Sequence, residues 1–281
     1  MWSIIGGTGF EKFENFKIKR LLDRKTPFGE TSSGLSLVEI FGKEVIYISR
    51  HGQHHEVLPS EINYRANIFA LKKFGATKII SISSVGSLKH EFAPGDCVVP
   101  NQYIDRTKGI RKHSFCGEGI VGHVSLANPV DGILFEGLKN MVHGLNTKIH
   151  FGGAYVTVEG PYYSTSAESH SFIASGGHVI GMTNFPEYGL AREAGLAYLP
   201  LSFITDYDCW NDSVAHVTLD VVNQIMQTNK LKAFQIIERI LKGMSEYLPQ
   251  GIPEQGLKFG LMTDLNSVPS PQRAWLDILL K

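Results

Sequence analysis

The sequence contains few cysteines, and none lies in a metal-binding arrangement. Its 281 residues include Cys97, Cys116 and Cys209, an odd number without Cys-x-x-Cys spacing. Such a set forms no complete disulfide framework and supplies no pattern of zinc ligands. We therefore expect reduced thiols, no metal centre and a cytoplasmic protein.

An excess of one charge and long apolar runs are also missing. Lys and Arg together number 27, as do Asp and Glu, so the formal net charge is zero. A balanced chain offers no electrostatic case for nucleic acid or an anionic membrane as partner. No apolar run reaches the roughly 18 residues of a membrane span, and Trp2 to Ile5 resembles a strand rather than part of a signal peptide.

Internal repeats and low-complexity linkers are absent, so we expect one domain over residues 1–281, with a weakly patterned tail from 249. The central pattern is a strand over Gly177–Gly181, a helix from Pro186 to Gly195, and an uncharged strand over Ala197–Ile204. A proline opening and a glycine closing a helix is the usual asymmetry of helix ends. This alternation predicts an α/β fold around a parallel or mixed sheet.

Other expected elements follow the same reasoning from periodicity and turn residues. We expect strands over 2–5, 36–41, 43–49, 78–83, 97–100 and 153–158, helices over 59–74, 131–143 and 218–247, and a short closing helix over 274–280. Residues 105–123 are rich in Gly and Lys and are expected to form a mobile loop.

Small polar or cationic side chains follow four of these strands. They are Thr8, Arg50 with His51, Ser83 with Ser84, and Thr183. In α/β sheets, ligands bind where the carboxyl ends of strands meet. Glycine amides, hydroxyls and a guanidinium that forks onto phosphate oxygens are suited to an oxyanion, so we predict a phosphate site.

Simpler interpretations of these segments remain open at this point. Gly6 to Gly9 lacks the following helix of a dinucleotide fold and any Gly-Lys-Ser/Thr, but it can be a plain turn. The cluster of His51, His54 and His55 lacks acidic partners for a metal, yet it can be solvated surface charge. Asp206 and Asp208, which follow the uncharged strand, can form a surface Asx turn.

Ten short blocks of the sequence together resemble the trimeric purine nucleoside phosphorylases, and most closely their methylthioadenosine phosphorylase branch. They are Ile4-Ile-Gly-Gly-Thr-Gly9, Arg50-His51-Gly52, Asn63-Tyr-Arg-Ala-Asn67, Val85-Gly-Ser87, Pro94-Gly-Asp96, Glu159-Gly-Pro161, Ala167-Glu-Ser169, Met182-Thr183, Pro186-Glu187 and Thr205-Asp-Tyr-Asp208. The resemblance implies one α/β domain with a distorted mixed sheet flanked by helices. It also implies a homotrimer, with a hexamer as alternative, and phosphorolysis of an N-glycosidic bond with phosphate as co-substrate and no cofactor.

The same resemblance assigns site residues. Phosphate is expected at Thr8, Arg50, His51, Ser83, Ser84 and Thr183. The nucleoside is expected at Met182 beside the ribose, Tyr163 beside the base, Asp206 and Asp208 at the purine edge, Leu219 and Val222 around a methylthio group, and His123 lent by a neighbouring subunit.

Chemically, Asp206 is expected to deliver a proton to N7 of the departing purine as a general acid. A carboxyl does this only if desolvation raises its pKa, which the preceding apolar strand favours. Asp at this position favours 6-amino purines such as methylthioadenosine. The alternatives are a phosphorylase for methylthioinosine, inosine or guanosine, and a non-catalytic nucleoside- or phosphate-binding protein.

Overall fold

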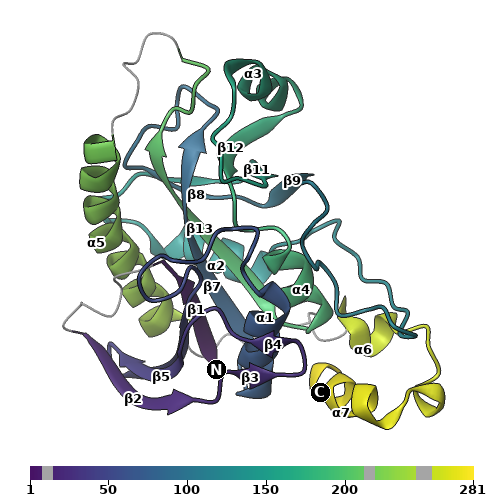
Figure 1. Cartoon of the computed structure of the whole chain (residues 1–281). Coiled ribbons are helices and arrows are strands. Elements are labelled where there is room, and N and C mark those ends of the chain that lie inside the picture. Colours follow the sequence, from purple (N-terminus) through teal and green to yellow (C-terminus); the bar gives the residue numbers. More distant parts are fainter. Residues whose placement is uncertain (8–14, 212–218, 245–254) are drawn as a thin grey trace.

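The computed structural model describes residues 1–7, 15–211, 219–244 and 255–281, with the side chains of 219–224 left aside. A mixed β-sheet crosses the molecule with helices on both faces, as Figure 1 shows. The expected fold class, a mixed sheet flanked by helices, is confirmed. Within the described residues, the helices are too short or too polar to span a bilayer.

Eleven strands of the described chain join in this sheet. They are β1 (Trp2–Gly6), β2 (Phe16–Leu22), β5 (Leu35–Ile40), β6 (Lys43–Ser49), β7 (Lys78–Ser87), β8 (Cys97–Val99), β9 (Gln102–Arg106), β10 (Ile149–Phe151), β11 (Ala154–Val158), β12 (Gly177–Gly181) and β13 (Ala197–Asp206). β3 (Lys25–Thr26) and β4 (Gly29–Glu30) form a separate small hairpin.

The helices are α1 (Tyr64–Lys73), α2 (Gly132–Met141), α3 (Ser166–Ala174), α4 (Glu187–Glu193), α5 (Leu219–Gly243), α6 (Leu257–Gly260) and α7 (Ser270–Leu279), with a 3₁₀ turn over Leu265–Ser267. α2 and α5 cover one face of the sheet, where Leu134 and Ile237 pack into one buried cluster. α1 and α4 cover the other face, where Phe69 and Leu190 belong to a second cluster, and α7 packs on α1.

Four neighbouring strands run in the same direction. β6, β1, β7 and β13 pair in parallel in that order, so their carboxyl ends reach one edge of the sheet. β12 pairs antiparallel to the far end of β7 and therefore approaches the same edge from the opposite side. The strand ends expected to hold a ligand are thus brought together by the topology.

Two expectations about local structure need correction. The first long helix begins at Tyr64 rather than at Pro59, because the Asn63 side chain caps it by accepting a hydrogen bond from the Ala66 amide. β7 continues to Ser87, four residues past its expected end. In addition, α3 lies outside the expected elements, although its capping box of Thr165 and Glu168 is a signal that a sequence carries.

The segment expected to be a mobile loop is anchored. Its first residues belong to β9, and the residues Arg111 and Phe115 are buried, with 4% and 2% of their total surface exposed. The C-terminal tail packs against this segment, because Leu276 of α7 lies in one buried cluster with Ile120. α6 and α7 appear together at the lower right of Figure 1.

Candidate active site at the strand ends

The centre of the candidate site is a stretch of β7 that has a strand neighbour on one side only. β1 leaves β7 at Ser81, and β12 joins the same side of β7 only at Gly86. Between these points, residues 82–85 pair with β13 alone. Backbone groups facing the gap lack a neighbouring strand there, so this interruption of the sheet offers them to a ligand.

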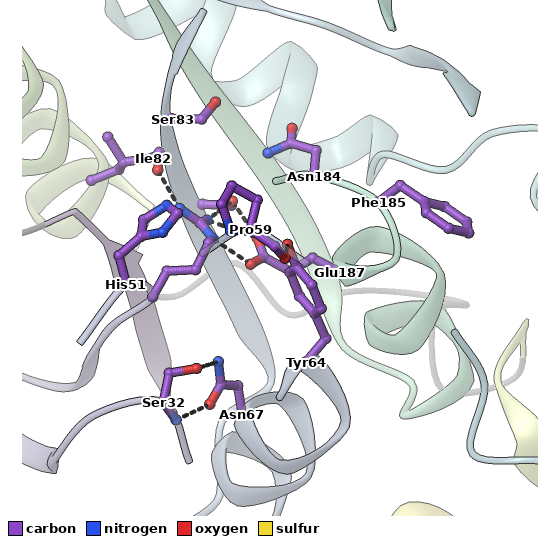
Figure 2. Close-up of polar contacts among 12 residues, drawn as sticks. Ser32, His51, Pro59, Tyr64, Asn67, Ile82, Ser83, Asn184, Phe185 and Glu187 are labelled. Carbon is purple, nitrogen blue, oxygen red and sulfur yellow. Dashed lines mark hydrogen bonds and ion pairs between the residues drawn. The ribbon is translucent and has the colours of Figure 1, made fainter. Parts of the chain in front are cut away.

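β12 delivers a polar turn to this gap. Its pairing sets Val179 opposite Ser87 and Ile180 opposite Gly86, so the chain that follows runs back beside residues 83–85. Thr183 comes two residues after the end of β12 and is buried, as is Asn184. In Figure 2, Asn184 lies across from Ser83, above the dashed contacts of Glu187.

Arg50, just after β6, is almost completely buried and carries most of the polar contacts of this region. Its Nε and Nη2 groups donate to the two oxygens of Glu187 at 2.8 and 2.9 Å, while Nη2 also donates to Ser81. Nη1 donates to the Ile82 carbonyl at 2.8 Å (Figure 2). The two-point fork is therefore made with Glu187, and among the described contacts one of the five N–H groups stays available.

The charge of Arg50 is secured by the same contacts. Burial alone would favour the neutral form, but the Glu187 carboxylate outweighs it and holds the pKa of Arg50 above its ordinary value. Glu187 in turn accepts hydrogen bonds from Ser81 at 2.5 Å and from Tyr198 at 2.8 Å. Glu187 is thus a positioning residue for Arg50 that the sequence interpretation did not assign to the site.

His51 is neutral in this environment. Burial and the neighbouring Arg50 charge lower its pKa to about 4. Its Nδ1 lies 3.0 Å from the Val57 carbonyl, which only accepts, so Nδ1 carries the hydrogen and Nε2 is an acceptor. An acceptor beside a guanidinium is suited to an oxyanion that still carries a proton, such as hydrogen phosphate.

Three further expected phosphate ligands surround the gap. Ser83 is buried and lies 3.2 Å from the hydroxyl of Ser202. Ser84 is exposed in the middle of an otherwise buried strand, which marks the opening of the site. Thr183 faces the hydroxyl of Tyr155: burial raises the pKa of Tyr155, and Thr183 and Ser83 partly lower it.

The Tyr155 hydroxyl is fully buried and has no hydrogen-bond partner of good geometry among the described residues. It fits there because position 181 is glycine. A Cβ atom at Gly181 would come within 2.7 Å of Cζ of the Tyr155 ring and closer still to its hydroxyl. Since buried polar groups normally have partners, this hydroxyl points to a polar occupant of the site.

The two aspartates lie at the end of β13, where its pairing with β7 becomes irregular between Ile204 and Asp206. Such a bulge re-aims the next side chain. Both Asp206 oxygens accept hydrogen bonds, from the Asp208 amide at 2.8 Å and from the Thr205 hydroxyl at 2.7 Å. A Cβ atom at Gly86 would lie 3.1 Å from Asp206 Oδ1, so glycine admits this close approach.

Asp208 has the desolvated environment that the sequence analysis expected for Asp206. Burial, together with the nearby Asp206 charge, raises the pKa of Asp208, although a contact with Ser169 opposes the shift. Its Oδ2 atom is buried without a hydrogen-bond partner within the described chain. Asp208 also has φ of +52°, a conformation in which short polar side chains are the most frequent non-glycine residues.

The remaining expected residues are more dispersed. Met182 is half-buried, and its side chain lies next to Gly160. Tyr163, in contrast, is 80% exposed. His123 is exposed, and its amide donates to the Gly260 carbonyl beside α6, away from the strand ends in Figure 1. Thr8 and the side chains of Leu219 and Val222 lie outside the described residues.

A metal centre finds no support in the described part of the chain, which contains no group of three or more His, Cys, Asp or Glu side chains suited to an ion. His51 and His55 stack on one another with ring centroids 4.5 Å apart. Their imidazoles therefore face each other as rings rather than converging on a common point.

Comparison with known proteins agrees with this geometry. A model described as "Phosphorylase superfamily" matches residues 3–242. S-methyl-5'-thioadenosine phosphorylase of Geobacter sulfurreducens is 38% identical over 278 residues, covering 99% of this chain and 96% of the relative. The enzyme of that name from Synechocystis is 41% identical over 280 residues, covering 99% and 86%.

Solved structures give the same result. A methylthioadenosine phosphorylase from an antarctic soil metagenomic library has a TM-score of 0.91 at 38% identity, covering 100% of this chain and 98% of that one. Methylthioadenosine phosphorylase from Schistosoma mansoni in complex with adenine has a TM-score of 0.83 at 33% identity, covering 90% and 95%. The chain belongs to the phosphorylase superfamily.

Proposed function

We propose that this protein is an S-methyl-5'-thioadenosine phosphorylase, a pentosyltransferase that converts methylthioadenosine and phosphate into adenine and 5-methylthioribose 1-phosphate. The carrying observation is the interrupted sheet. Its gap joins an oxyanion-binding set, around Arg50 and Thr183, to two carboxyls at the end of β13. Relatives bearing this activity in their names match nearly the whole chain.

The chemistry follows from the two halves of this site. Phosphate, held by Arg50, His51, Ser83, Ser84, Thr183 and Thr8, would stabilise the cationic sugar that develops as the glycosidic bond breaks, and then attack it. Met182 and Tyr163 would flank the ribose and the base, and Leu219 and Val222 the methylthio group. The purine leaves after protonation at N7, for which Asp206 is the proposed acid, and Asp208, with its raised pKa, is the alternative.

Base preference is the second part of the proposal. A carboxylate that accepts hydrogen bonds is complementary to a 6-amino group, whereas it would face a carbonyl oxygen in a 6-oxopurine. The exposed Tyr163 hydroxyl can also reach a purine edge, so methylthioinosine, inosine and guanosine are the competing substrates.

One assay tests the reaction and the preference together. Purine release is measured from methylthioadenosine, adenosine, methylthioinosine and inosine, each with and without phosphate. We expect phosphate-dependent release, fastest from methylthioadenosine. Equal release without phosphate would make the protein a hydrolase, and no release from any substrate would favour a binding protein. Arg50→Ala should raise the phosphate requirement and lower turnover while nucleoside binding survives.

We also propose a homotrimer of one-domain subunits, working in the cytoplasm without any cofactor besides the phosphate co-substrate. His123 supports the assembly because it is exposed and its amide is bound to Gly260 of α6, an element that lies away from the strand ends (Figure 1). Sedimentation combined with activity measured on dilution tests this point. A monomer that stays fully active would exclude it.

A further inference from the structure

Arg111 is a buried cation that the proposed reaction does not use. It lies in the segment between β9 and α2, and its side chain is 1% exposed. Nε donates to a Glu159 carboxylate oxygen at 2.5 Å, so the pair is electrically balanced. Such a balanced buried pair adds no net charge to the site, and its effect on the site must come from geometry.

The other contacts of Arg111 are almost all to backbone carbonyls. Nη1 donates to the carbonyls of Met182 at 2.8 Å and Phe185 at 2.6 Å. Nη2 donates to the carbonyls of Val158 and Glu159, at the end of β11. One guanidinium thus joins the ends of two neighbouring strands, and it brackets the Thr183–Asn184 turn from both sides.

The contact with Met182 has a consequence for Thr183. The Met182 carbonyl and the Thr183 amide belong to one trans peptide group, in which C=O and N–H point in opposite directions. Holding the carbonyl therefore aims the Thr183 N–H. The antiparallel pairing of Ile180 with Gly86 carries the chain after β12 back beside residues 83–85, so this amide lies at the gap in the sheet, where Thr183 also lowers the pKa of Tyr155.

We propose that Arg111 is a positioning residue that orients the Met182–Thr183 peptide group toward the phosphate subsite. This proposal rests on the proposed function for the identity of the anion. Arg111 does not touch the anion, because its donors are already directed to the six oxygens of Glu159, Tyr64, Met182, Phe185 and Val158. Loss of these contacts frees the peptide group to rotate, and misplacement by about 1 Å can cost about 10²-fold in rate.

The test compares Arg111→Lys and Arg111→Ala with Arg106→Ala, an exposed arginine at the end of β9. The lysine variant keeps the positive charge, but a single ammonium cannot reach all these carbonyls at once. For both Arg111 variants we expect kcat/KM for phosphate to fall about 10²-fold, through both kcat and KM. Affinity for free adenine should change less than about twofold, since the aspartates lie on β13.

Two readouts separate positioning from general damage. Guanidinium at a non-denaturing concentration should partly restore turnover of Arg111→Ala and leave Arg106→Ala unchanged. Inorganic phosphate alone should raise the melting temperature of the wild type more than that of Arg111→Lys, as expected when only the native state binds the ligand.

Several outcomes overturn the inference. They are a folded Arg111→Lys protein with unchanged phosphate KM and kcat, an equal loss of adenine and phosphate affinity, or equal stabilisation of both proteins by phosphate. If Arg111→Ala does not fold, Arg111→Lys keeps a charge opposite Glu159 and decides alone. A wild type without phosphate-dependent turnover would defeat the proposed function, while the phosphate-induced stabilisation still tests Arg111.

Discussion

Two buried Arg–Glu pairs support the candidate site, and they differ in what they leave free. Arg50 and Glu187 are 1% and 2% exposed, and Arg111 and Glu159 are 1% and 4% exposed. Arg50 binds mostly side chains and keeps one N–H available, whereas Arg111 spends its donors largely on carbonyls. Equal burial therefore serves two tasks: Arg50 can contact a ligand, and Arg111 can only shape the chain around it.

Breaking either pair is expected to have the largest effect on stability. Glu187→Gln and Glu159→Gln each leave a buried guanidinium without its counter-charge, which typically costs about 3–5 kcal/mol. Urea unfolding of both variants measures this loss. If the comparison holds, Glu187→Gln also raises the phosphate KM directly through Arg50. A loss below about 1 kcal/mol in either variant would mean that the pair contributes little.

The purine half of the site provides the next largest test. Asp206→Asn keeps the size of the side chain but adds an amide donor and cannot supply an acidic proton. We expect kcat/KM on methylthioadenosine to fall about 30- to 1,000-fold, which corresponds to about 2–4 kcal/mol of lost transition-state stabilisation. The relative preference should move toward methylthioinosine. The phosphate KM should change little, unlike in Glu187→Gln. An unmoved substrate ratio would shift attention to Asp208 or Tyr163.

His51, next to the Arg50–Glu187 pair, makes the stability of the protein sensitive to acid. Its pKa is about 4 in the folded protein against an ordinary 6.5, so between these values the unfolded chain binds the extra proton. Stability contributed by neutral His51 is therefore complete above about pH 6.5 and is lost as the pH falls toward 4, by up to about 3 kcal/mol. His51→Asn should flatten this part of the curve of unfolding free energy against pH. An unchanged slope would show that His51 titrates normally.

An exposed pair sets the lower limit of the comparison. Lys242 lies 2.6 Å from Glu238 on α5, and the two side chains are 61% and 37% exposed. Pairs of this kind contribute about 0.3–0.5 kcal/mol. Glu238→Gln should therefore shift the unfolding free energy by less than about 0.5 kcal/mol and weaken further in high salt. A loss as large as that of Glu159→Gln would remove burial as the explanation for the first prediction.

The two pairs also show where the sequence was informative. Arg50 follows an alternating strand directly, so a local pattern predicts its place at the sheet edge. Asp206 follows an uncharged strand in the same way. Both predictions depend on strand periodicity and on the rule that ligands gather at carboxyl ends. The structure confirms both strands: β6 ends at Ser49, directly before Arg50, and β13 runs to Asp206.

Arg111 could not be recognised by such reasoning. It lies in a Gly- and Lys-rich segment without periodicity, and its partners are 47 to 74 residues away in the chain. Carbonyl acceptors are the same for every residue type, so the sequence carries no sign of them. α7 is an intermediate case: the apolar spacing over 274–280 predicted a helix, but not that Trp275 would meet Phe28.

The Tyr155 hydroxyl and Gly181 constrain each other's replacement. Because even a methyl group at 181 would strike the tyrosine ring, position 181 cannot vary while Tyr155 stays, whereas position 155 can become smaller while Gly181 stays. A laboratory library that randomises 181 alone should return glycine almost exclusively, whereas one that randomises both positions can return a larger residue at 181 together with a smaller one at 155. During divergence, an enzyme could therefore acquire a larger residue at 181 only after the residue at 155 had become smaller, while 181 was still glycine. The order of the two changes, and not only their identity, is thus a property of this fold.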